Sequence, residues 1–177
     1  MQACFECFAE NGLHGTGIAA VAKYANVSKA TLYVYFADLD ELITESTAYC
    51  MANVEDDFMA KAPKSIDEVE KFIDEIPYWT AKTHGKKYRL MYQVYTHPKY
   101  IEYGKRFFSG VDERYLSYAK ALEPRLNISS EIITPLIFFF VRACVYYALF
   151  EDEFYLQTQM QLLKKSVKLF VGKGMIK

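Results

Sequence analysis

Basic residues are scarce at the start of this chain of 177 residues. Among residues 1–50 only Lys23 and Lys29 are basic, against six acidic residues, which gives this segment a formal charge of −4. The rest of the chain nearly balances it, so that 21 Lys and Arg stand against 22 Asp and Glu and the net charge is −1. Proteins that bind nucleic acids usually carry a basic excess. The charge taken alone therefore argues against a nucleic-acid partner.

Catalytic and cofactor-binding motifs are also missing. The chain contains no G-x-S-x-G, H-E-x-x-H, P-loop or G-x-G-x-x-G pattern, and His14, His84 and His97 have no neighbours at metal-ligand spacing. The sequence therefore predicts that the protein is not an enzyme and holds neither a cofactor nor a metal. With 5 Pro, 8 Gly and 52% hydrophobic residues, it also excludes a disordered or collagen-like chain.

The cysteines and one long apolar stretch indicate the compartment in which the protein is expected. No secretory signal is visible, and Cys4 and Cys7 are interpreted as small buried hydrophobic residues rather than as a redox pair or half of a zinc site. The stretch 132–150 is long enough to cross a membrane, but Pro135 near its start and Arg142 in its middle favour a buried helix. We expect a cytoplasmic protein with no membrane partner.

The hydrophobic periodicity is helical throughout, and no stretch alternates as a β-hairpin requires, so the chain is predicted to be all-α. Helices are expected at about 2–10, 18–24, 29–36, 40–61, 65–77, 86–96, 98–122, 130–150 and 152–171. A capping box at Ser65 should open the fifth of these, and Pro77 should kink or break it. Gly104 and Gly110 are expected to interrupt the stretch 98–122. Two domains are predicted: a three-helix head, residues 1–45, and a larger helical body, residues 46–177.

Two short helices joined by a tight turn give the head a helix-turn-helix pattern. Asn26 tolerates the left-handed conformation that the turn demands, and Ser28 is placed to cap the second helix. Val27 is expected to fill the crossing between the helices. Leu32 and Phe36, spaced four residues apart, should bury the second helix against the first.

The remaining side chains of the second helix point outward, as those of a recognition helix do in the major groove of DNA. They are Lys29, Ala30, Thr31, Tyr33, Val34 and Tyr35. Thr31 and Tyr33 offer hydroxyls to phosphate oxygens, and Val34 is suited to a thymine methyl. A generic helical hairpin with solvated Lys and Tyr side chains explains the same pattern.

The head also resembles a known family. The run ACFECFAENGLHGTGIAAVAKYANVSKATLYVYFADLDELI, residues 3–43, is similar to the N-terminal domain of the TetR family of transcriptional regulators. The similarity lies in its F-A-E-x-G, V-S-K-x-T-L-Y-x-x-F and E-L-I segments. It implies a helix-turn-helix at 17–36 that binds double-stranded DNA, followed by a variable effector-binding body. The DNA-binding residues that it implies are Thr16, Gly17, Ser28, Lys29, Ala30, Thr31, Tyr33, Val34 and Tyr35.

Three departures from the family pattern lower the expected number of phosphate contacts. Gly17 stands where the family usually has an N-capping Thr, and Leu39 where it usually has a phosphate-contacting Lys. The family also has a basic arm before the residue aligned with Ala3, so either the natural chain continues upstream or this head lacks the arm. Each missing contact weakens binding to DNA and flattens its dependence on salt.

The resemblance further implies a homodimer in which the last two long helices form a four-helix bundle with those of a partner subunit. Each of these helices carries an apolar stripe that supports burial. The stripes are Ile132, Leu136, Phe139, Val145 and Leu149 in one helix, and Leu156, Met160, Leu163, Val167 and Phe170 in the other. A core within one subunit accounts for the same stripes. A two-fold dimer would place its recognition helices about 34–36 Å apart on a palindromic operator.

Aromatic residues crowd the body, and buried tyrosine hydroxyls, like an arginine within an apolar helix, need polar partners. This predicts a pocket for an aromatic or amphipathic small-molecule effector. Its candidate residues are Trp79, Tyr92, Tyr95, Phe107, Tyr115, Phe139, Arg142 and Tyr146. Pairing of Arg142 with Glu131 or Glu151, or across the dimer interface, is the alternative.

The function predicted from the sequence is a ligand-responsive repressor that binds a palindromic operator as a homodimer through residues 17–36. The alternative, which the acidic head allows, is a helical ligand-binding dimer that has lost DNA binding.

Overall fold

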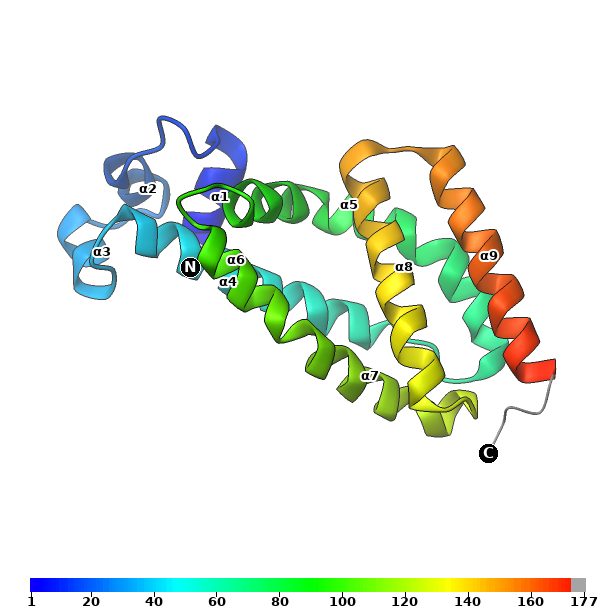
Figure 1. Ribbon diagram of the computed structural model, residues 1–177. Helices are drawn as coiled ribbons and strands as arrows, with labels where there is room; N and C mark the ends of the chain where they lie inside the picture. Colours follow the sequence, from blue (N-terminus) through cyan, green and yellow to red (C-terminus); the bar gives the residue numbers. More distant parts are fainter. Residues whose placement is uncertain (173–177) are drawn as a thin grey trace. The chain divides into compact units, whose positions relative to one another are not determined.

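The computed structural model describes residues 1–172, and every regular element within them is a helix. In chain order, and from blue to red in Figure 1, these are α1 (Gln2–Asn11), α2 (Ile18–Tyr24), α3 (Lys29–Tyr35), α4 (Leu39–Ala60), the short 3-10 helix η1 (Ile66–Glu68), α5 (Val69–Tyr95), α6 (Ile101–Ser109), α7 (Val111–Leu126), α8 (Ser130–Phe150) and α9 (Glu153–Gly172). The predicted all-α class is confirmed.

The chain packs as two compact units. The first unit contains Met1–Asp57 and Lys86–Phe108, and the second contains Phe58–Gly85 and the described residues from Ser109 onward. The N-terminal part of α5 therefore belongs to the second unit and its last turns to the first. The whole head lies in the first unit. The domain boundary predicted after residue 45 stays a prediction, since packing units need not coincide with functional domains.

Helix α5 corrects two predictions, the break at Pro77 and the capping box at Ser65, while the kink at Pro77 stays a prediction. It runs through Pro77 without ending, although proline removes a backbone hydrogen bond and costs a helix interior about 3 kcal/mol. Ile73 and Ile76, which are 2% and 6% exposed, hold this stretch of the helix in the core of the second unit. Tertiary packing of this kind stabilises helices more than local propensity does. The predicted capping box does not form, because the side chain of Ser65 makes no capping bond and Glu68 accepts at 2.8 Å from the N–H of Lys64, the residue before the N-cap.

The two glycines predicted to interrupt 98–122 behave differently. Gly110 separates α6 from α7, as expected, whereas Gly104 lies inside α6. A Cβ at Gly104 would overlap the carbonyl oxygen of Tyr95 and lie 2.9 Å from the Tyr95 Cβ. Gly104 is therefore required for the close approach of α6 to the end of α5, not for a break in the helix.

The core of the second unit is built around α8, which packs against α7 and α9. Phe140 and Cys144 of α8 are buried there with Leu156, Met160 and Leu163 of α9. The three α9 residues are at most 4% exposed, so this part of the predicted α9 stripe fills the subunit's own core. Any contact with a second subunit must use other faces of these helices.

Helix α8 is long and apolar enough to cross a membrane, and 33% of its apolar window is buried within the protein. Ile133, Phe140, Ala143, Cys144 and Ala148 are the positions that turn inward, each at most 5% exposed. A core helix passes the same test of length and composition as a membrane span, and these buried positions mark α8 as a core helix.

Candidate nucleic-acid interface

The helix-turn-helix of the head is formed by α2, the turn 25–28 and α3. Asn26 adopts the left-handed conformation predicted for it, with φ of 53°. The N–H of Val27 donates to the carbonyl of Ala22 at 2.9 Å, which closes the turn onto α2. Val27 itself is 40% exposed, so the prediction that it fills the helix crossing is wrong.

A small apolar core fixes the position of α3 in the head. Val21 of α2 is fully buried and Leu32 of α3 is 5% exposed, while Phe36 is only partly buried. Helix α2 packs against both α1 and α3. On α1, Cys4 and Cys7 are 3% and 1% exposed, which confirms their interpretation as buried hydrophobic residues.

The start of α3 is capped as predicted. The Ser28 Oγ accepts a hydrogen bond from the Thr31 N–H at 3.0 Å, and the two hydroxyl oxygens lie 2.8 Å apart, within hydrogen-bond distance. This pair fixes the N-terminal turn of α3. It also ties part of the hydrogen-bonding capacity of both hydroxyls to the protein itself.

The outer surface of α3 is exposed to solvent. All six side chains predicted to face outward are exposed, and the exposed fraction reaches 55% for Tyr33, 76% for Val34 and 74% for Tyr35. Several exposed apolar side chains at adjacent positions are typical of a binding surface. On this evidence α3 is the candidate recognition helix.

The two remaining predicted DNA contacts, Thr16 and Gly17, lie just before α2 and differ in exposure. Gly17 is exposed at the N-terminus of α2, in extended backbone and without a side-chain cap. Thr16 is 4% exposed and its hydroxyl donates to the carbonyl of Gly12 at 2.6 Å, so this side chain secures the loop. Gly12 and Gly15, with φ of 78° and 88°, supply the left-handed conformations that the loop requires. The contacts of Thr16 and Gly17 with DNA stay predictions.

The acidic residues after α3 have structural roles. Asp38 accepts from the Glu41 N–H at 2.9 Å, and Glu41 accepts from the Ala37 N–H at 2.5 Å. Asp38 therefore caps the start of α4, while Glu41 binds the backbone of the residue before Asp38 and not that of Asp38, as a capping box would require. The Asp38-x-x-Glu41 spacing is a pattern visible in the sequence, and it places the helix start one residue before the predicted Asp40.

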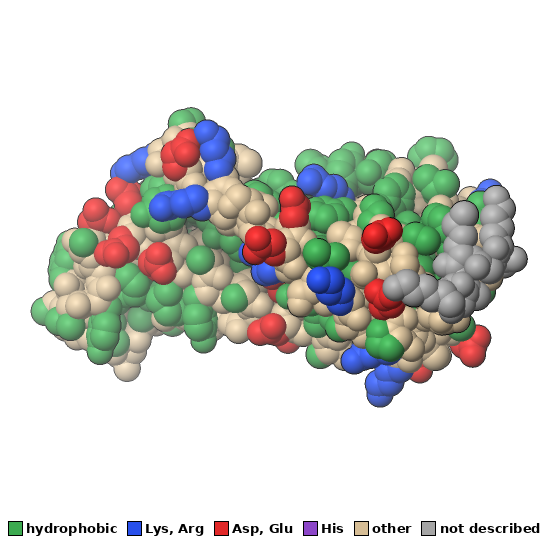
Figure 2. Space-filling model, turned by 60° about the horizontal axis from the view of Figure 1, so that its bottom comes forward, with side chains coloured by type: hydrophobic (Ala, Val, Ile, Leu, Met, Phe, Trp, Pro, Cys, Tyr) green, Lys and Arg blue, Asp and Glu red, His purple; other side chains and the backbone are tan. Residues whose placement is uncertain are grey.

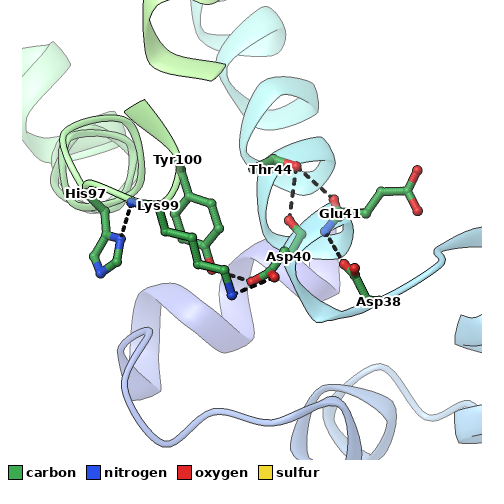
Figure 3. Close-up of polar contacts among 7 residues, drawn as sticks. All are labelled: Asp38, Asp40, Glu41, Thr44, His97, Lys99 and Tyr100. Atoms are coloured by element: carbon green, nitrogen blue, oxygen red, sulfur yellow. Dashed lines mark hydrogen bonds and ion pairs between the residues drawn. The ribbon is translucent and has the colours of Figure 1, made fainter. Parts of the chain in front are cut away.

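Asp40 is tied to the segment that leads into α6. Its carboxylate lies 2.6 Å from the Lys99 Nζ and accepts from the Tyr100 hydroxyl at 2.7 Å (Figure 3). Hydrogen bonds from Lys99 and then Tyr100 lower the pKa of Asp40. Burial, followed by the hydrogen bond to Asp40, raises the pKa of Tyr100 to about 12. The first turn of α4 is thus bound to residues 60 positions away in the sequence.

The contacts of Asp40 with Lys99 and Tyr100 predict that the stability of the protein depends on pH. A carboxyl whose pKa is lower in the folded state stabilises the fold above its ordinary pKa of 3.8, and the effect is lost as pH falls through the lowered value. Because both charged side chains are partly exposed and solvent screens the pair, Asp40→Asn should destabilise the protein by only about 0.5–1 kcal/mol at pH 7. The difference from the unmutated protein should shrink below pH 4. Urea unfolding at pH 7 and pH 3 measures it, and an equal difference at both values would contradict the linkage.

The predicted effector-binding residues divide between the two units. Tyr92, Tyr95 and Phe107 lie in the first, where the rings of Tyr95 and Phe107 are 5.0 Å apart. The other five, Trp79, Tyr115, Phe139, Arg142 and Tyr146, lie in the second. A surface hollow at the turn between α7 and α8, lined by Glu123, Asn127, Ile128 and their neighbours, contains none of the eight.

The expectation that Arg142 is buried and needs a polar partner inside the protein is wrong. Its side chain is exposed, so it needs no buried anion, although the helix around it is apolar. The inward face of α8 is the opposite one, which carries Phe140 and Cys144. A helix that is hydrophobic all round gives no periodicity from which its inner face could be predicted.

The geometry of residues 1–45 is that of a helix-turn-helix domain, and a larger helical body follows it in the chain. Residues 1–45 match the sequence model of the bacterial regulatory proteins of the tetR family. The match covers about a quarter of the chain and shows that this segment is similar to the N-terminal domain of TetR-family regulators.

Solved structures of this family share the fold of nearly the whole chain. A TetR transcription regulator from Haloarcula marismortui has 16% identity and a TM-score of 0.70, over 95% of this chain and 94% of its own. A TetR-family regulator from Mesorhizobium loti has 17% identity and a TM-score of 0.69, over 97% and 92%. FadR from Thermus thermophilus, a TetR-family repressor in complex with lauroyl-CoA, has 16% identity and a TM-score of 0.54, over 93% and 89%. No curated protein matches the sequence.

Proposed function

We propose that the protein is a ligand-responsive repressor that binds a palindromic DNA operator as a homodimer through residues 17–36. The observation that carries the proposal is the outer surface of α3, where six side chains remain exposed on a helix fixed by Leu32 and capped by Ser28. The hydroxyls of Thr31, Tyr33 and Tyr35 and the charge of Lys29 are suited to phosphate oxygens. We place this function in the cytoplasm, where the operator is found.

The homodimer is supported by apolar side chains that α8 and α9 leave exposed. The exposed fraction is 65% for Phe150, 84% for Phe154, 54% for Leu162 and 56% for Leu169. Figure 2 shows hydrophobic side chains gathered over the part of the molecule that carries these helices. Several such residues on adjacent helices mark a protein interface more than isolated ones do. We propose that they, rather than the buried α9 residues, pack against the partner subunit.

The effector site is proposed in the second unit, at the predicted aromatic residues that lie there, which are Trp79, Tyr115, Phe139 and Tyr146. The fold-related Thermus thermophilus repressor binds lauroyl-CoA, a long amphipathic acyl compound, and aromatic walls suit a ligand of that kind. Repression would be relieved if the effector favours a dimer whose heads are spaced differently from the operator half-sites. A ligand shifts such an equilibrium only through its different affinity for the two conformations.

A footprint of the dimer on DNA tests this function. Duplexes selected from a random-sequence library by the full chain should be palindromic. The protein should protect two half-sites about one helical turn, or a multiple of it, apart from centre to centre. Sedimentation at the same concentration should give twice the mass of the chain. The alternative, a ligand-binding dimer that has lost DNA binding, rests on the −4 charge of residues 1–50, and it predicts the dimer without any selected duplex.

A further inference from the structure

The helical geometry of α3 fixes which side chains occupy the centre of its outer surface. Successive residues of an α-helix are rotated by about 100°, and Leu32 marks the inward direction because it is buried in the head. Ala30 and Val34, two residues on either side, then lie about 160° from Leu32 and flank the direction that points straight out. Both are exposed, and Val34 is 76% exposed.

The polar side chains of α3 lie to the sides of this centre. By the same rotation Thr31 and Tyr33 lie about 100° from Leu32, and Lys29 and Tyr35 about 60°. These positions face the walls of a groove into which Ala30 and Val34 point. The Thr31 hydroxyl is in addition engaged with Ser28. Hydroxyls and an ammonium group at the walls are suited to the phosphate backbone, whose contacts position a protein but carry no base sequence.

The side chains at the centre, Ala30 and Val34, therefore cannot form the hydrogen bonds by which guanine, adenine or cytosine is recognised. Those bases are recognised in the major groove by paired hydrogen bonds from Arg or Lys, from Asn or Gln, and from Asp or Glu. Within Lys29–Tyr35 the only residue of these types is Lys29, at the first position and near the wall. Ala30 and Val34 present only methyl groups. The one apolar feature of a base edge in the major groove is the C5-methyl of thymine.

We propose that the operator is read chiefly through thymine methyl groups that pack against Ala30 and Val34, so that each half-site is rich in A·T pairs beneath α3. This inference rests on the proposed DNA-binding function and names the base chemistry that serves it. In the complex, thymine methyl groups would then bury the exposed side chain of Val34. Removing one contacted methyl should weaken binding about fourfold, the effect of burying one apolar carbon group.

Replacement of thymine by 2′-deoxyuridine tests the proposal, because uracil keeps the pairing and both carbonyl oxygens and lacks only the methyl. Duplexes are first selected by the full chain from a random-sequence library at 50 mM salt. In the best duplex, uracil at a contacted position in both half-sites should weaken binding about tenfold or more. Uracil outside the half-sites should leave the affinity unchanged.

The variant Val34→Ala tests whether the weakening by uracil depends on the side chain of Val34. It should bind the thymine duplex more weakly and lose most of its response to uracil at the position that Val34 contacts. Selected duplexes whose affinity is indifferent to uracil, and depends instead on the N7 of guanine, would overturn this inference and leave the proposed function intact. Enrichment of no duplex would overturn the proposed function and this inference together.

Discussion

Replacing Leu32 with alanine should lower the free energy of unfolding by about 2–5 kcal/mol and abolish binding to DNA. Leu32 is 5% exposed and is the only buried residue of α3. Its loss leaves a cavity at the contact that holds α3 in the head, and a seven-residue helix is not stable without such packing. Urea unfolding and binding to a selected duplex measure the two effects.

The matched control for Leu32→Ala is Val34→Ala, on the same helix and 76% exposed. Because that side chain has few contacts within the protein, its loss should change the free energy of unfolding by less than about 0.5 kcal/mol. Equal stability of the two variants would show that Leu32 does not anchor the recognition helix.

Gly104→Ala should destabilise the protein by about 1–3 kcal/mol. Alanine is ordinarily the better residue inside a helix, by about 0.5–1 kcal/mol, so the expected sign is the reverse of the usual one. The reason is steric, since the added Cβ would overlap the carbonyl oxygen of Tyr95 and lie 2.9 Å from the Tyr95 Cβ. Backbone atoms cannot move aside as a flexible side chain can. Helix α6 would have to shift, and with it the segment that holds Asp40.

Gly85→Ala provides the comparison for this prediction. Gly85 also lies inside a helix and is buried, but a Cβ there would be 3.6 Å from the nearest atom, the carbonyl oxygen of Ala148, which is an ordinary contact. This variant should be as stable as the unmutated protein or slightly more stable. Thermal unfolding of both variants separates the two cases, and stabilisation by Gly104→Ala would contradict the close approach of α6 to α5.

Local patterns predicted the head well because they depend on neighbours in the sequence. The cap at Ser28, the left-handed Asn26 and the buried Leu32 each follow from residues within one or two helical turns, and each is present in the structure. Val27 shows the limit of this reasoning. A hydrophobic residue in a turn can be placed inside or outside only when the crossing of the two helices is known.

Contacts between distant segments could not be predicted from the sequence. Helix α5 continues through Pro77 because Ile73 and Ile76 are held by the core of the second unit. Asp40 pairs with Lys99 and Tyr100 across about sixty residues, and nothing in either segment indicates the other. The cap that Asp38 provides for the Glu41 N–H, by contrast, is a local pattern that the sequence does contain.

Hydrogen bonds and an ion pair explain why the head contains several acidic residues. Asp38 and Glu41 cap α4, and Asp40 is neutralised by Lys99, which lies outside the acidic segment. These three carboxylates therefore serve the fold and do not exclude a DNA-binding role for α3. Within residues 1–45, however, only Lys23 and Lys29 are basic. Binding must then depend on few charged contacts.

The salt dependence of binding to a selected duplex tests this account most directly. Two heads offer four lysines, Lys23 and Lys29 in each, so the slope of log K against log salt should be no steeper than about −4. Lys29→Ala should reduce the slope by about 2 for the dimer, whereas Lys71→Ala, in the body, should leave it unchanged. Sequence-specific binding with this shallow slope is the predicted result. A slope near −8, or no specific binding at 50 mM salt, would contradict it.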